Sequence, residues 1–265
     1  MITREPTPVT GPLSALAHAF GEIGRAGILA FQSVLLLPVT LFRWRSRREL
    51  VSQMYQAGIK SLPIISVVAL FTGMILALQV GLELRRYNQE IYIGSAVMVS
   101  LLREMGPFMT GIVLTACVGS SMAAQLGTMT VNEEIAALEM MAINPVRFLM
   151  APRMGAMLFM TPLLSFYTCV LGVIGGGVVG FTQLSVPWRQ YIKTAVDFAD
   201  TRDLYVGLLK ALVFAVIITT VACYEGFTTT RGAVGVGQAT RRSVISSLLL
   251  ILMTGYIITR MFYDL

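Results

Sequence analysis

Five apolar stretches dominate this chain, and each is close to the length that crosses a lipid bilayer. A membrane-spanning helix needs about 20 apolar residues. Backbone polar groups in lipid must be satisfied within the protein, and stretches of this length satisfy them as helices. The sequence therefore predicts an all-α integral membrane protein with five transmembrane helices, at about residues 61–82, 94–124, 154–181, 204–227 and 244–259.

The composition supports a membrane protein and argues against nucleic-acid binding. Hydrophobic residues make up 55% of the chain and charged residues 13%, whereas a soluble domain carries about 25% charged residues. The net charge is +6, but the basic residues lie between the apolar stretches and do not form one patch with interleaved aromatic residues. Membrane topology explains them better, because lysine and arginine gather in cytoplasmic loops.

The distribution of these basic residues predicts the orientation. Segments 1–60, 125–153 and 228–243 together contain twice as many lysines and arginines as the segments on the opposite side of the five spans. The positive-inside rule therefore places the N-terminus in the cytoplasm and the C-terminus on the far side of the membrane. Within the N-terminal segment, residues 26–42 are apolar but short, and Pro38 interrupts them. A basic flank follows, so we expect an interfacial helix there and not a full span.

Two features of the spans predict how they pack. Residues 91–124 are longer than the hydrocarbon core requires, so this helix either protrudes from the bilayer or breaks near Gly106 and Pro107. Small residues recur every four positions in two spans, which favours close helix packing. They are Gly73, Ala77 and Gly81 in the first span, and Gly172, Gly176 and Gly180 in the third.

The polar segment 128–147 carries an amphipathic helix pattern. Thr130 followed by Glu133 matches a capping box, and Pro145 ends the pattern. Spacing places one apolar face on the helix, made of Val131, Ile135, Leu138 and Ala142. Glu133, Glu134 and Glu139 make the rest acidic. The inner leaflet attracts basic faces, so an acidic helix on that side suits a protein partner better than the membrane surface. The alternative is an ordinary capped loop helix.

Arg103 and Glu104 form the most informative charged pair. An ionisable residue at membrane depth indicates a functional site by default; the alternative is that both residues are solvated at the outer interface. The chemistry of an enzyme is missing, since His18 is the only histidine and no hydrolase, kinase or zinc-protease motif occurs. If energy is spent, another subunit must bind the nucleotide.

The block LLREMGPFMTGIVLTACVGSSMAAQLGTMTVNEEIAALEMMAINPVRFLMAPR at 101–153, with GVGQATRRSVISS at 235–247, closely resembles the MlaE/YrbE family of ABC-transporter permeases. The resemblance covers roughly residues 25–262. It implies a homodimeric permease of the bacterial inner membrane that moves phospholipids between the inner and outer membranes. It also implies an elbow helix at 26–42, a cytoplasmic ABC ATPase (MlaF-like) that carries ATP and Mg²⁺, an MCE-domain lipid-binding protein (MlaD-like) and a small STAS-domain protein (MlaB-like). No cofactor is expected on this chain.

The same resemblance implies roles for individual residues. Thr130–Ile143 would be the coupling helix that contacts the ATPase, with contacts expected from Thr130, Glu133, Glu134, Ile135, Leu138, Glu139, Met140 and Met141. Arg103 and Glu104 match the family's pair near a lipid-binding cavity. The apolar lining of that cavity is expected from Leu101, Leu102, Met105 and Phe108.

The chain departs from the family pattern at two positions. Cys117 stands where the family has arginine, and Gln125 where it has glutamate. One hypothesis is that these residues formed an ion pair that was lost as a unit, which would leave no unpaired charge. Two other functions stay open at this point. A structural membrane subunit would have no lipid cavity, and an ion-coupled carrier would work without ATP or a partner.

Overall fold

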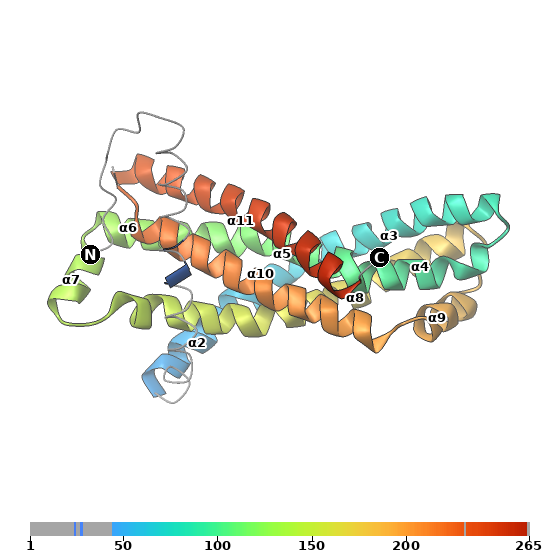
Figure 1. Ribbon diagram of the computed structural model, residues 1–265, viewed down its shortest axis with the longest axis horizontal. Coiled ribbons are helices and arrows are strands. Elements are labelled where there is room, and N and C mark those ends of the chain that lie inside the picture. Colours follow the sequence, from blue (N-terminus) through green and yellow to red (C-terminus); the bar gives the residue numbers. More distant parts are fainter. Residues whose placement is uncertain (1–23, 25–26, 29–43, 231, 264–265) are drawn as a thin grey trace. The chain divides into compact units, whose positions relative to one another are not determined.

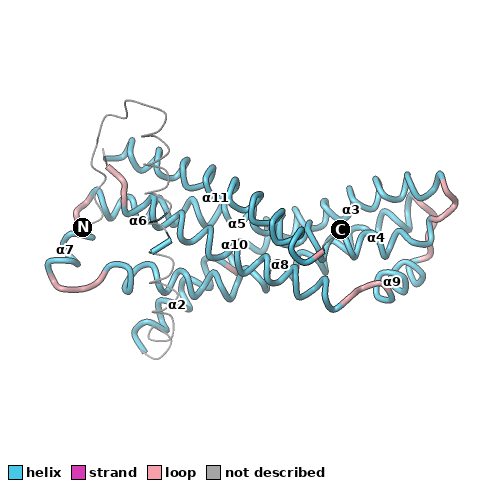
Figure 2. The backbone as a smooth tube through the Cα atoms, in the orientation of Figure 1, coloured by secondary structure: helices cyan, strands magenta, loops and turns pink. Residues whose placement is uncertain are grey.

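A computed structural model describes residues 24, 27–28, 44–230 and 232–263 of the chain, and the described part is helical with no strand (Figures 1 and 2). Its longest helices are α3 (Leu62–Arg86), α8 (Ala151–Gln183), α10 (Thr201–Phe227) and α11 (Gly232–Phe262). Shorter helices are α2 (Trp44–Ala57), α4 (Ile93–Ser100), α5 (Gly106–Leu114), α6 (Ser120–Val131), α7 (Glu134–Met140) and α9 (Trp188–Asp197). Single 3₁₀ turns, η1 (Ile59–Ser61) and η2 (Glu90–Tyr92), precede α3 and α4, and π-helical turns occur at η3 (Leu101–Met105), η4 (Thr115–Gly119) and η5 (Val146–Met150).

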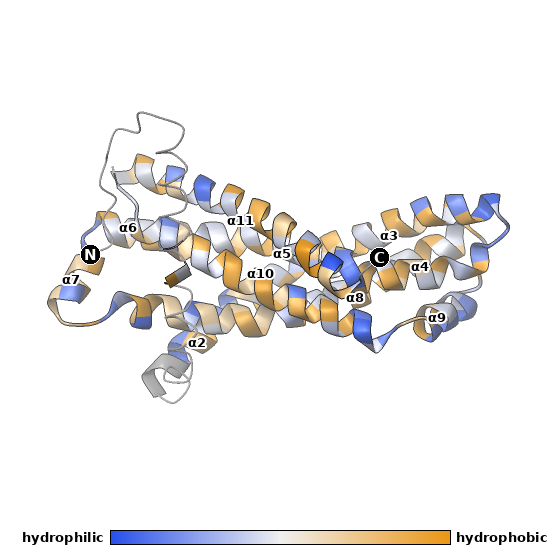
Figure 3. Ribbon diagram, in the orientation of Figure 1, coloured by the Kyte–Doolittle hydropathy of each residue, from blue (hydrophilic) through white to orange (hydrophobic). Residues whose placement is uncertain are grey.

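Five helical stretches are long and apolar enough to cross a membrane, which confirms the predicted all-α membrane fold. They are Arg48–Arg86, Glu90–Val131, Val146–Gln183, Thr201–Phe227 and Gly232–Phe262. Figure 3 shows hydrophobic residues along these helices and hydrophilic residues at several of the turns between them. Each helix extends beyond the apolar stretch from which it was predicted, because helical geometry continues into the polar ends. The interfacial helix predicted at 26–42 lies almost wholly outside the described residues.

The second span does not end at Gly106 and Pro107. It continues from α4 to α6 through the π-helical turns η3 and η4. The Gly106 N–H bonds to the Leu101 carbonyl, five residues earlier, so the turn before Pro107 is widened. Proline has no N–H and its ring would crowd the carbonyl four residues before it, here that of Arg103. The widened turn therefore keeps the helix continuous past Pro107 and leaves the Arg103 carbonyl free for another donor.

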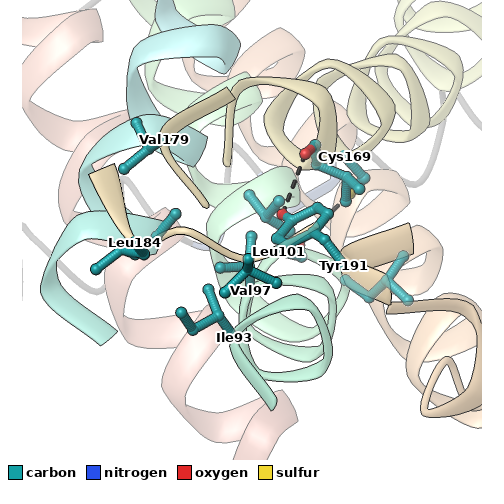
Figure 4. Close-up of a cluster of buried hydrophobic side chains, with 11 residues drawn as sticks. Ile93, Val97, Leu101, Cys169, Val179, Leu184 and Tyr191 are labelled. Atoms are coloured by element: carbon teal, nitrogen blue, oxygen red, sulfur yellow. Dashed lines mark hydrogen bonds between the residues drawn. The ribbon is translucent and has the colours of Figure 1, made fainter. Parts of the chain in front are cut away.

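The chain divides into two compact units, which we call the charged-pair unit and the α7 unit. The charged-pair unit comprises residues 58–114, 159–214 and 250–265. Its core includes Ile93 and Val97 of α4, Leu101 of η3, Cys169 of α8 and Tyr191 of α9 (Figure 4). Tyr191 is fully buried, and its hydroxyl donates to the Val173 carbonyl at 3.1 Å. This bond fixes α9 against α8.

Helices α3 and α8 approach each other through glycine, as the small-residue pattern predicted. Ile65, Ala69, Gly73, Ala77 and Gly81 form one buried stripe along α3. A Cβ atom added at Gly73 would lie 1.8 Å from the carbonyl oxygen of Gly172, so no larger residue fits between the two backbones. Small residues permit this close approach of membrane helices.

The α7 unit comprises residues 1–57, 115–158 and 215–249, of which only part is described. Its core contains Leu126 of α6, Met150 of η5, Met154 of α8, and Tyr224 and Phe227 of α10. Gly127 of α6 passes close to Thr229, because a Cβ atom there would lie 2.9 Å from the Thr229 hydroxyl. The Thr130 hydroxyl, one turn later, donates to the Gly226 carbonyl at 2.9 Å. These contacts hold the end of α6 against the end of α10.

Candidate functional sites

Arg103 and Glu104 each form an ion pair, with different partners on α10. The Arg103 Nε lies 2.8 Å from Oδ1 of Asp203, and the Glu104 Oε1 lies 2.6 Å from Nζ of Lys210. The two partners on α10 are buried, each with a side chain 1% exposed, whereas Arg103 and Glu104 are 42% and 40% exposed. Two positive and two negative charges thus compensate one another, which lowers the cost of placing them within apolar spans.

Thr259 and Tyr263, near the C-terminal end of the sequence, complete this cluster. Lys210 Nζ also donates to the Thr259 hydroxyl at 2.7 Å, and the Thr259 hydroxyl in turn donates to Glu104. The Tyr263 hydroxyl donates to Asp203 Oδ1 at 2.5 Å, and the Arg103 guanidinium lies 4.5 Å from the centre of the Tyr263 ring. We call Arg103, Glu104, Asp203, Lys210, Thr259 and Tyr263 the charged cluster.

Tyr263 lies just beyond the last span, and its environment keeps the phenol protonated. Burial raises the pKa of its hydroxyl above the ordinary value, and the hydrogen bond to Asp203 raises it further. The charge of Asp203 acts in the same direction, because a second negative charge beside it is unfavourable. The phenol is therefore a stable donor to Asp203.

The sequence predicted Arg103 and Glu104 as a site but missed their partners. Both predicted residues are ion-paired, which differs from the alternative of two solvated charges. Asp203, Lys210, Thr259 and Tyr263 were not singled out. Lys210 could have been found, because it is an isolated ionisable residue inside the predicted span 204–227.

The four apolar residues predicted to line a cavity have different environments. Leu101 is fully buried in the core of the charged-pair unit, and Met105 packs against the same core. Phe108 is partly exposed on α5. Leu102, 7% exposed, contributes to a groove of about 430 Å³. The structure thus places Leu102 alone of these four in that groove.

The groove, which we call the α8 groove, lies among α4, η3, α8, α9 and α10 of the charged-pair unit. Its lining includes Met98 of α4, Leu102 of η3, Phe166, Val170 and Ile174 of α8, and Leu204 of α10. Its volume lies within the range of small-molecule sites, roughly 300–1,000 Å³. Asp200 and Thr201 supply the polar part of its lining. The groove is therefore a predominantly apolar recess with one carboxylate.

The segment predicted as a coupling helix is shorter than expected, and the capping box is wrong. Thr130 lies in the last turn of α6, where its hydroxyl donates to the carbonyls of Leu126 and Gly226. Glu133 has a left-handed backbone with φ of 60°, and its side chain makes no capping hydrogen bond to α7. The helix therefore runs from Glu134 to Met140 and not from 130 to 143. The contact between Thr130 and α10 outweighs the local capping preference.

The predicted apolar face is also only partly formed. Ile135 and Leu138 pack against the core of the α7 unit. Val131 belongs instead to α6, and Ala142 is exposed with a left-handed φ of 58°. Non-glycine residues rarely adopt this conformation, and it costs about 1–2 kcal/mol per residue. Short α7 is thus bracketed by two strained residues, Glu133 and Ala142.

The remaining face of α7 is open and acidic. Glu133, Glu134 and Glu139 are exposed, as are Met140 at 83% and Met141 at 62%. A recess of about 510 Å³ lies beside them, lined by Thr130, Glu133, Ile135, Glu139 and Phe227 among others. Exposed large apolar residues beside charged ones are typical of a protein-binding surface. We call these exposed residues and the recess the α7 surface.

Gln125 interacts with a partner that the sequence did not suggest. Arg153 of α8, 6% exposed, donates through Nη2 to Gln125 Oε1 at 3.3 Å and through Nη1 to the Leu149 carbonyl at 3.0 Å. Gln125 and Cys117 lie eight positions apart, a rise of about 12 Å along a helix. Arg153 is therefore a better candidate than residue 117 for the interaction partner of the side chain at position 125.

Comparisons with known proteins identify the family. The Permease MlaE family model matches residues 50–261. This chain belongs to the MlaE permease family. Among its relatives, a probable ABC transporter permease of Rickettsia prowazekii is 33% identical over 247 residues, 93% of each chain. One of Synechocystis is 34% identical over 219 residues, 83% of each chain.

A further relative has a more specific description. The intermembrane phospholipid transport system permease protein MlaE of Haemophilus influenzae is 33% identical over 248 residues, 92% of this chain and 93% of the relative. The chain is therefore a multi-pass ABC-transporter permease of the MlaE family. The predicted family is confirmed.

Proposed function

We propose that this chain is the permease subunit of an ABC transporter that moves phospholipid between the inner and outer membranes and so supports outer-membrane lipid asymmetry. The similarity to the H. influenzae phospholipid permease over nearly the whole chain carries the proposal. The proposed location is the bacterial inner membrane, with the N-terminus in the cytoplasm and the C-terminus in the periplasm. An MCE-domain protein receives or supplies the lipid, and a STAS-domain protein is a further proposed partner.

The α7 surface supports a separate ATPase partner. It offers three exposed carboxylates and the exposed side chains of Met140 and Met141. ATP and Mg²⁺ would bind to that ATPase, and this chain would carry no cofactor. ATP-driven closure of the ATPase would then act through α7, and the strained residues Glu133 and Ala142 make its two ends natural points of movement.

A second copy of the chain is the proposed partner of α11 and α3. The most apolar window of α11 is only 17% buried and that of α3 28%, against 61% for α10. Large apolar residues on α11, among them Leu252, Met253, Tyr256 and Ile257, are exposed. A homodimer would cover these faces, and the lipid cavity proposed for the family would lie between the two copies.

Co-purification tests the assembly. The native complex is extracted in mild detergent, and its proteins and lipids are identified by mass spectrometry. Recovery of an ABC ATPase, an MCE-domain protein and phospholipid supports the proposal. Recovery without any ATPase, under conditions that preserve other membrane complexes, favours an ion-coupled carrier if the chain alone transports lipid in liposomes, and a scaffold subunit if it does not.

Charge reversal tests the ATPase contact at α7. A Glu133→Lys and Glu139→Lys double variant is expected to lose most of the co-purifying ATPase, because both carboxylates line the recess. Glu83→Lys is the matched control, since Glu83 is an exposed glutamate of α3 whose side chain is 63% exposed. Equal ATPase recovery from both variants would argue against docking at α7.

The charged cluster is tested separately through transport. Glu104→Ala is expected to weaken lipid transport without abolishing assembly, because Lys210 keeps its bonds to the Arg103 carbonyl and Thr259. Transport is measured with a fluorescent phospholipid in reconstituted vesicles containing the full complex. Unchanged transport in this variant would count against a functional role for Glu104.

A further inference from the structure

The α8 groove is separate from the faces of α3 and α11 that the proposed homodimer would cover, because neither helix contributes to its lining. Its floor is formed by buried residues, among them Leu102, Cys169 and Val173. The Cys169 thiol donates to the Leu101 carbonyl at 3.4 Å, which joins α8 to η3 beneath the groove. Its rim is formed by Phe166, Val170 and Ile174, which recur every four residues along α8 and are 40–46% exposed. The groove is thus closed below by buried residues and open along one face of α8.

The shape of this rim suits a flexible chain better than another helix. Helices that associate in membranes do so through small residues that let the backbones approach. The small-residue stripe of α8 is already used within the unit, since Gly172 faces Gly73 and Gly176 lies against Tyr191. The rim residues Phe166, Val170 and Ile174 are large by comparison and would hold a second helix away. An acyl chain can follow the spaces between them.

The lining of the α8 groove contains one charged side chain, that of Asp200. Asp200 is exposed, lies immediately before the span formed by α10, and lines the groove together with Thr201. The two nearby arginines make their direct contacts with other residues, and Asp200 acts on Arg103 only through its charge. Arg202 donates to the Phe262 carbonyl and faces the Tyr263 ring, and Arg103 pairs with Asp203. The charge that the lining of the groove presents is therefore negative.

We propose that the α8 groove binds one acyl chain of a bilayer phospholipid, with the cationic amine of its head group beside Asp200. The ligand class is an aminophospholipid, such as phosphatidylethanolamine. The apolar lining takes the chain, and the carboxylate selects a head group that carries a positive charge. This binding site does not depend on the transport function proposed above, because occupancy of the groove is measured without transport.

Photo-crosslinking tests the acyl-chain contact. The complex is placed in nanodiscs that contain phosphatidylethanolamine or phosphatidylglycerol probes with the same diazirine-bearing acyl chain, and labelled peptides are mapped by mass spectrometry. Labelling is expected at residues 166–174 and 192–204. Val170→Trp and Ile192→Trp, which fill the groove from α8 and α9, are expected to abolish it. Leu163→Trp is the control, since Leu163 is 59% exposed on the same helix and does not line the groove.

Asp200→Asn tests the head-group contact. Asp200 Oδ1 accepts the Arg202 N–H at 3.0 Å, and asparagine preserves this bond while removing the charge. The wild-type protein is expected to favour the ethanolamine probe about two- to fivefold, the range of an exposed charge pair. In Asp200→Asn this preference disappears while labelling of the groove persists.

Three outcomes would overturn the proposal. Equal labelling of residues 166–174 in folded Val170→Trp and Ile192→Trp variants and in the wild type would exclude the groove as the binding site. A persistent ethanolamine preference in Asp200→Asn would exclude the contact with Asp200. Crosslinking of this face to a protein chain, with no lipid label, would show that a protein occupies the groove.

Discussion

Lys210 Nζ lies 2.6 Å from Oε1 of Glu104, although 106 positions separate the two residues in the chain. The same ammonium donates to the Arg103 carbonyl at 2.7 Å, an oxygen to which Pro107, four residues on, has no N–H to donate. Pro107 in one span thus removes a backbone donor, and Lys210 in another span supplies a donor to the same carbonyl. The side chain of Lys210 satisfies both the carboxylate and the exposed backbone oxygen, and it ties α10 to η3.

Replacing Lys210 with methionine is expected to destabilise the protein by about 2 kcal/mol. Removing one partner of a buried pair costs roughly 3–5 kcal/mol, but water can reach the Glu104 side chain, which is 40% exposed, and this reduces the penalty. The measurement is the thermal unfolding midpoint in detergent. Adding Glu104→Gln to Lys210→Met is expected to cost less than the two single changes together, because the pair is coupled. Strict additivity would show that the two side chains do not interact.

The sequence predicted the membrane helices well because each span is one continuous apolar stretch, which can be recognised without knowing its partners. The partner of Glu104 is different, because it depends on how α10 lies against η3, and no spacing rule connects residues 104 and 210. The capping box failed for a related reason. The Thr130 hydroxyl bonds to Gly226, 96 positions away, so a tertiary contact replaced the local one that Thr130 and Glu133 suggested.

Tyr263→Phe is expected to lower stability by about 1–2 kcal/mol, because it removes a hydrogen bond to a charged acceptor. The loss should be equal at pH 6 and pH 9. Burial and Asp203 raise the pKa of the phenol, so its stabilising effect is complete below the ordinary tyrosine pKa of about 10 and is lost only when the pH passes the raised value. Unfolding midpoints of both proteins at the two pH values provide the check. A difference that shrinks between pH 6 and pH 9 would contradict a protonated donor.

Gly73→Ala is expected to cost about 3 kcal/mol, because the new methyl group would overlap the Gly172 backbone and force α3 away from α8. Gly237→Ala is the matched control within α11. A Cβ atom at Gly237 meets nothing within 4 Å, and alanine stabilises a helix by about 1 kcal/mol relative to glycine. Thermal unfolding should therefore shift in opposite directions in the two variants. Similar shifts would mean that the α3–α8 contact is looser than 1.8 Å implies.

Gln125→Glu is expected to stabilise the protein by about 0.5–1 kcal/mol without any change at Cys117. Arg153 is 6% exposed and already donates to Gln125 Oε1 at 3.3 Å, and a carboxylate at this position would convert that bond into a stronger charge-assisted one. Water reaches the exposed end of residue 125, which keeps the gain small. Unfolding midpoints are compared for Gln125→Glu, Cys117→Arg and the double variant. Cys117→Arg alone is expected to destabilise the protein. Adding Gln125→Glu should not restore its stability, because the new carboxylate would already be paired with Arg153. If the double variant were stable and Gln125→Glu alone were not, positions 117 and 125 would be the true pair.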